Sequence, residues 1–174
     1  MTTQALSLAN IELTKFSIEE KYTTYSFRVP QANGIRTFDG VKDTRRPLPS
    51  LYEAAKKLGV VVAKLSEVTA EGVAFTGITV AQSDKREGWK LAGSKPYKQS
   101  HGKMNLNPPV RFESHSDAKQ EYGVKDVKLI RAFLDECVAY IQGASTQGEL
   151  FEQGDGMSEG EPEVTANPAP AAAE

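Results

Sequence analysis

Alternating apolar and polar positions near the N-terminal end of the chain predict two β-strands and a hairpin. From Ile11 to Ile18 apolar side chains recur at about every second position, with one break in phase, and Tyr22 to Val29 repeats the pattern. Asn33-Gly34 then marks a tight hairpin turn, because both central residues of such a turn need positive φ. A short third strand is therefore expected from Ile35 to Phe38.

The middle of the chain is predicted to form one short helix followed by further strands. Apolar residues recur at helical spacing between Ser50 and Leu58, and Gly59 is expected to end that helix. Short apolar runs predict strands from Val60 to Leu65, from Val73 to Val80 and from Trp89 to Ala92.

The clearest periodicity lies between Gly123 and Gly143, where apolar residues fall at helical spacing over a wide face. This pattern predicts a long helix buried against the sheet, with Cys137 as a packing residue on its apolar side. Residues Gly93 to Pro109, in contrast, show no apolar period, so a long, mobile, basic loop is expected there. A short strand should follow from Val110 to Phe112.

These elements predict an α+β fold. About six or seven antiparallel strands would form a curved sheet or a small OB-like barrel, closed by one short helix and the long C-terminal helix. Residues 1–145 are expected to be the globular domain. Residues 146–174 consist mainly of Gly, Glu, Pro and Ala, and such a segment buries too little apolar surface to fold, so a disordered tail is expected.

Charge is distributed unevenly along the chain. The net charge is −2, but seven acidic residues and no Lys or Arg lie between Gln147 and Glu174. Residues 1–146 hold all 21 basic residues and 16 acidic ones, a net charge of +5. A mildly basic domain with an acidic tail is typical of a protein that binds a polyanion or a charged partner.

Several classes of protein are excluded or disfavoured. No apolar run approaches the roughly 18 residues of a membrane span, and the N-terminal residues lack the basic and apolar regions of a signal peptide. A single cysteine rules out a disulfide within the chain. We therefore expect a cytoplasmic protein, in the host cytoplasm if the protein is viral, with no membrane partner.

No motif predicts catalysis. The chain has no glycine-rich phosphate loop and no serine-nucleophile elbow. His101, His115 and Asp117 are the best set for a metal ion, but their spacing fixes no geometry, and solvated loop residues are the simpler interpretation. We expect no enzyme, no metal and no cofactor.

Basic and aromatic residues crowd into residues 85–112, where Glu87 is the only acid. Cations that follow phosphates and rings that stack on unpaired bases are the groups that hold single-stranded nucleic acid. Arg45 and Arg46, in a loop with two prolines, would extend this track. The candidate nucleic-acid-binding residues are Arg45, Arg46, Lys85, Arg86, Trp89, Lys90, Lys95, Tyr97, Lys98, Lys103, Arg111 and Phe112.

Two of these assignments have a plainer alternative. Trp89 shares a strand face with Leu91, which favours burial in the core over stacking on a base. The lysine-rich loop could be solvated without binding anything. Tyr97, inside that loop, is the better stacking candidate.

The acidic tail also allows more than one interpretation. It could compete with nucleic acid for the basic domain or recruit a replication or host protein, since tethering gives it a high effective concentration. It could equally serve only for solubility. Whether the chain forms a homo-oligomer is left open.

Two resemblances to known proteins favour a role in DNA metabolism. A basic domain with an acidic tail resembles the layout of bacterial and phage single-stranded DNA-binding proteins, whose domains are mostly OB-folds. The tail departs from theirs, because it ends in Ala171-Ala172-Ala173-Glu174 and not in acids followed by an aromatic residue. Residues 73–80, 89–93, 104–109 and 147–151 are similar to small phage proteins encoded among replication and recombination genes.

The sequence thus favours sequence-tolerant binding of single-stranded DNA in phage replication or recombination. The alternative is a protein-interaction factor, or an inhibitor of a host enzyme such as a defence enzyme, that binds no nucleic acid. DNA and RNA are not distinguished by the sequence.

Overall fold

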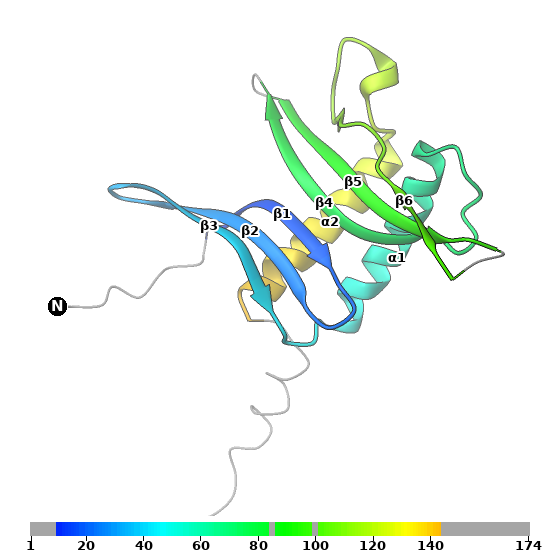
Figure 1. The fold of residues 1–174 in the computed structure, drawn as a ribbon. Coiled ribbons are helices and arrows are strands. Elements are labelled where there is room, and N and C mark those ends of the chain that lie inside the picture. Colours follow the sequence, from blue (N-terminus) through cyan, green and yellow to red (C-terminus); the bar gives the residue numbers. More distant parts are fainter. Residues whose placement is uncertain (1–9, 84–85, 99–100, 144–174) are drawn as a thin grey trace, which may run out of the picture.

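Seven strands and two α-helices build an α+β fold around one antiparallel sheet (Figure 1). The computed structural model describes residues 10–83, 86–98 and 101–143, so the predicted acidic tail and Lys85 lie outside the described residues. In chain order the elements are β1 (Glu12–Ile18), β2 (Thr23–Gln31), β3 (Gly34–Asp43), α1 (Pro49–Leu65), β4 (Ala74–Ser83), β5 (Arg86–Pro96), β6 (Lys103–Leu106), β7 (Arg111–Phe112) and α2 (Val124–Ile141).

The sheet is open. Its strand order is β3-β2-β1-β4-β5-β6, with β7 added on β5, and β3 and β6 stand at opposite edges. The barrel alternative of the sequence prediction is therefore wrong, whereas the antiparallel sheet and its strand number are confirmed. Both α-helices lie against one face of the sheet (Figure 1), so the hydrophobic core forms between helices and sheet and needs no closure of the strands.

The order of elements repeats, although the sequence shows no repeat. Three antiparallel strands and a helix (β1, β2, β3, α1) are followed by a second set of the same kind (β4, β5, β6, α2). The first strand of each set meets the other at the centre of the sheet. Each helix crosses over: α1 packs on β4 and β5, and α2 packs on β1 and on α1. Because each helix packs on strands of the other set, the two sets share one hydrophobic core.

The first helix is longer than predicted. α1 runs through Gly59 to Leu65, so the strand predicted from Val60 to Leu65 is wrong. Gly59 has no positive φ, and a Cβ on it would lie 2.9 Å from the carbonyl oxygen of Val73, so glycine here allows close packing of the helix on the chain before β4. Of the β-branched residues after it, Val61 and Val62 are buried and Val60 is exposed, and such a short apolar run cannot be distinguished from a strand by periodicity alone.

About half of the predicted basic loop from Gly93 to Pro109 is sheet. β5 continues to Pro96, and β6 pairs with it, placing Leu106 opposite Gly93. The pattern was missed because β6, at the edge of the sheet, and the end of β5 beside it carry mainly small and polar residues. β3 is likewise longer than predicted. The hairpin is confirmed, but Gln31 pairs with Gly34, so its two turn residues are Ala32 and Asn33. Positive φ (+132°) occurs at Gly34 and not at Asn33.

The core is strongly aromatic. Phe16 lies about 6.0 Å, centroid to centroid, from Tyr25, Phe133 and Tyr140. The long C-terminal helix is confirmed as α2, and its Cys137 is fully buried, which raises the pKa of its thiol and makes it a packing residue. Neither described α-helix has the length and apolar character that a membrane crossing requires.

Candidate nucleic-acid interface

The face of the sheet opposite the helices, named here the outer face, is not covered by α1 or α2 (Figure 1). Side chains on a strand alternate between faces, so the neighbours of each buried core residue belong to the outer face. Phe16, Ile78 and Leu91 are buried and lie side by side on β1, β4 and β5. The residues next to these three on each strand therefore have their side chains on the outer face.

A cation-bearing row crosses the outer face at its centre. The register places Lys15 on β1 opposite both Ser26 on β2 and Thr79 on β4, and Thr79 opposite Lys90 on β5. Lys15, Thr79 and Lys90 are exposed. The row spans four strands and offers the ammonium groups of Lys15 and Lys90 and the hydroxyl group of Thr79. Ser26 is buried, and its hydroxyl is bonded to Asp39 and to the amide of Gly40.

The adjacent row consists of small residues. Thr24, Ser17, Gly77 and Ala92 occupy consecutive strands in register. A Cβ on Gly77 would lie 2.8 Å from the carbonyl oxygen of Phe16, so the close approach of β4 to β1 requires glycine here. Side chains in this row therefore project little from the outer face beside the two lysines.

Cations outnumber acids on the strands of this face. Alternation and register place six basic residues there: Lys15, Arg28, Lys42, Arg86, Lys90 and Lys103. Two acidic residues share the face, Glu12 and Asp39. Asp39 accepts a hydrogen bond from the Ser26 hydroxyl. The surplus of positive charge suits a polyanion.

Aromatic rings stand near two ends of this face. Phe112 on β7 pairs with Gly88, and its ring occupies the space that a Gly88 Cβ would need, 2.6 Å from Cδ1. The ring stacks on His115, with centroids 5.4 Å apart. In the other half, the Lys42 ammonium lies 5.1 Å from the centre of the Tyr22 ring.

Arg45, expected to contact phosphates, is partly exposed and is engaged in contacts within the protein. Its guanidinium binds the carboxylate of Asp43 through two nitrogens, at 2.6 to 3.1 Å, and donates to the carbonyl oxygen of Tyr140. It also lies over the Tyr140 ring, 5.1 Å from the centroid. The Tyr25 hydroxyl donates to Asp43 at 2.9 Å. This network joins β2, β3 and the end of α2.

Protonation in this network follows from its contacts. Burial and the hydrogen bond to Asp43 raise the pKa of Tyr25 to about 12. Burial alone would raise the pKa of Asp43, but the hydrogen bonds from Arg45 and Tyr25 outweigh it and the pKa is lowered. The Asp43 carboxylate in turn raises the pKa of Arg45. The group is a structural clamp, fixed as an ion pair with a neutral phenol.

Trp89 has no exposed surface, so its expected stacking role is wrong and the alternative of a core residue is correct. Its ring packs on Tyr122, whose hydroxyl donates to the Trp89 carbonyl oxygen at 2.9 Å. Lys95 also turns away from the outer face, because its ammonium donates to the Thr69 carbonyl oxygen at 2.7 Å. Arg111 is half-buried in β7.

The other predicted residues divide into two groups. Arg86, Lys90, Lys103 and Phe112 lie on or beside the outer face, spread along the length of β5, with Arg86 at its start and Lys103 opposite its end. Tyr97 and Lys98 are exposed at the turn between β5 and β6, and Arg46 is exposed before α1. Sequence reasoning missed Lys15, Arg28 and Lys42, isolated cations on three different strands. Their only signal was a polar position in an alternating run.

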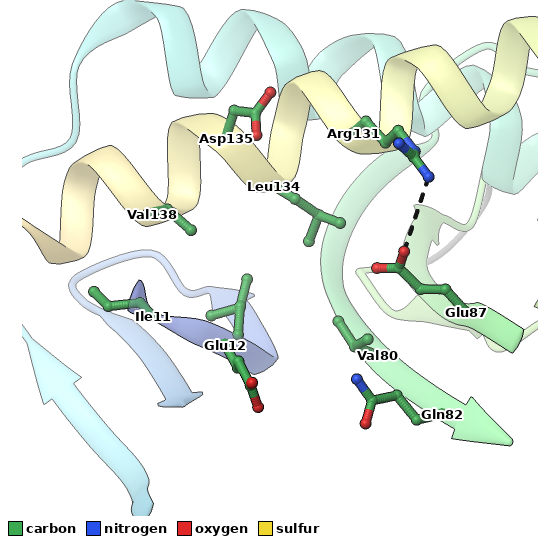
Figure 2. Close-up of a pocket in the computed structure, with 10 residues that line it drawn as sticks. Ile11, Glu12, Val80, Gln82, Glu87, Arg131, Leu134, Asp135 and Val138 are labelled. Carbon is green, nitrogen blue, oxygen red and sulfur yellow. Dashed lines mark ion pairs between the residues drawn. The ribbon is translucent and has the colours of Figure 1, made fainter. Parts of the chain in front are cut away.

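A crevice opens in the sheet next to the central row. β1 and β4 pair only from Lys15 to Ser17 and then diverge, leaving a hollow of about 430 Å³ on the outer face. A second hollow of about 360 Å³ lies on the helix side of the same gap. Figure 2 shows this side, with Leu134 and Val138 of α2 pointing toward the gap and Arg131 paired with Glu87.

Comparison with known proteins gives no match to a family model, to a curated protein or to a solved structure.

Proposed function

We propose that the protein binds single-stranded DNA without strong sequence preference, using the outer face of the sheet. The observation that carries this proposal is the uncovered face on which six cations are spread over five strands against two acids. Phosphate groups contribute most of the affinity of such proteins, and spread cations can follow a phosphate chain. A role in phage replication or recombination rests on the resemblance of the sequence alone.

The arrangement suits contacts to a backbone more than contacts to base edges. The central row presents ammonium and hydroxyl groups, both of which bind phosphate oxygens, and the row of small residues lets a strand approach closely. The rings of Phe112 and His115 lie where a base at the end of the track can stack. Few groups that read base identity are present in these two rows, which supports sequence tolerance.

The test is fluorescence anisotropy of the full chain with a labelled oligo-dT of about 30 nucleotides, at low and at physiological salt. A duplex of the same length is the matched control. We expect the single strand to bind more tightly than the duplex, with affinity that falls steeply as salt increases. Absence of binding to either ligand at low salt would contradict the proposal.

A second function, binding of a partner protein, is favoured by the edge strand β3. Within the described residues no strand pairs with its outer edge, and Ile35 near the hairpin tip is 64% exposed. An open edge of ten residues offers backbone groups to a strand of another protein. This function predicts a stable complex with one partner and negligible affinity for oligonucleotides.

A further inference from the structure

The crevice between β1 and β4 combines the chemistry needed to hold a nucleobase. Its outer hollow is lined by ten residues: Glu12, Leu13, Thr14, Lys15, Ser26, Arg28, Asp39, Thr79, Val80 and Gln82. Leu13 and Val80 supply apolar surface, while Thr79 and Gln82 supply donors and acceptors. A volume of about 430 Å³ falls within the usual range of small-ligand sites, roughly 300 to 1,000 Å³.

The crevice also lies on the path proposed for the phosphates. Lys15 belongs to both the central row and the lining of the crevice, and Arg28 lines its far side. Apart from Lys90, the rest of the two rows consists of Ser, Thr, Gly and Ala, with no ring on which a base could stack. A base turned toward the sheet at its centre therefore finds apolar contact only in the crevice.

The gap continues toward the helices. The hollow on the helix side shares Glu12, Leu13, Val80 and Gln82 with the outer one, and Leu134 and Val138 lie behind them. In Figure 2 Glu12 on β1 and Gln82 on β4 stand on opposite sides of the gap. An inserted base would therefore have a carboxylate on one side and an amide on the other.

We infer that the crevice takes up one base of a bound single strand and favours a base with an exocyclic amino group (cytosine, adenine or guanine) over thymine. The inference rests on the proposed function. A carboxylate accepts a hydrogen bond from the amino group of cytosine or adenine, whereas thymine offers no amino group. Base insertion also excludes duplex DNA, whose bases are paired and stacked.

The experiment measures binding of the full chain to equal-length labelled oligo-dC, oligo-dA and oligo-dT, and to an oligonucleotide of the same length with abasic sites. We expect oligo-dC and oligo-dA to bind about fivefold more tightly than oligo-dT, and the abasic strand to bind most weakly. Glu12→Gln should abolish the preference over oligo-dT, while Glu53→Gln on the exposed side of α1, an equal change of charge, should preserve it.

Each outcome decides a separate point. If abasic and base-bearing strands bind equally, or if the preference survives Glu12→Gln, the base-insertion inference is overturned while the proposed function stands. If no oligonucleotide binds, the proposed function itself fails. Val80→Phe offers an independent check, because a larger side chain in the crevice should equalise the three base-bearing strands, with the circular dichroism spectrum confirming that the variant folds.

Discussion

On the face of the sheet that the helices cover, Phe16, Ile78 and Leu91 form a buried row across three strands. One residue away on the same strands, Lys15, Thr79 and Lys90 form an exposed row on the outer face. The same register therefore builds both the core and the candidate interface. A shift of one residue would exchange them, so the proposed binding of DNA depends on the packing that fixes the register.

The largest expected difference between the faces concerns neighbouring residues on β5. Trp89→Ala removes the largest fully buried side chain and should lower the free energy of unfolding by about 3–5 kcal/mol. Lys90→Ala, on the outer face, should change it by less than about 0.5 kcal/mol. Urea unfolding followed by circular dichroism measures both, and equal losses would show that the outer face also carries stability.

Arg45 sharpens the comparison, because it was predicted to bind DNA but instead forms an ion pair that stabilises the fold. Arg45→Ala leaves the Asp43 carboxylate without its partner and should destabilise the protein by about 1.5–3 kcal/mol. Affinity for single-stranded DNA should stay unchanged. Normal stability together with weakened DNA binding in this variant would show that Arg45 belongs to the interface.

Stability should also depend on pH through Tyr25. Its folded-state pKa, about 12, lies above the value near 10 of an unfolded chain, so the contribution of the neutral phenol is complete below pH 10 and is lost as the pH rises through 12. The loss should amount to about 2 kcal/mol. Urea unfolding between pH 9 and 12 measures it, and Tyr25→Phe should remove this step; an unchanged profile in that variant would contradict the assignment.

A smaller effect is expected from exposed tyrosines on the two sides of the molecule. Tyr97, at the turn between β5 and β6, is 53% exposed, and Tyr52 on α1 is 44% exposed. Tyr97→Ala should weaken binding of oligo-dT about fivefold at any salt concentration, through loss of stacking. Tyr52→Ala is the matched control. Equal affinities in the two variants would remove Tyr97 from the interface.

The sequence predicted those parts of the fold in which local pattern and tertiary burial agree. Phe16 and Trp89 sit in alternating runs, and α2 has one continuous apolar face, so each was placed in its correct element. β6 is polar because it lies at an edge, and the second half of α1 is rich in valine because it packs on a sheet. Local propensity misleads in both cases, because the neighbouring elements decide the outcome.

The candidate site was harder to predict for a geometric reason. The cations between residues 85 and 112 were predicted to bind nucleic acid because they are close in sequence, yet the side chain of Lys95 turns to the helix side. Lys15, Arg28 and Lys42 are far apart in sequence and come together only through strand register. Cations that are close in sequence are thus not always close on the surface, and the pairing of strands decides which cations become neighbours.

The most direct test of the central claim compares two pairs of lysines on opposite sides of the protein. Lys15→Ala/Lys90→Ala removes two cations from the outer face, and Lys56→Ala/Lys57→Ala removes two exposed cations from α1. Anisotropy with labelled oligo-dT across a salt series should show about tenfold weaker binding and a salt slope reduced by about two for the outer-face pair alone. Equal weakening by both pairs, or none by the outer-face pair, would contradict the assignment of the interface.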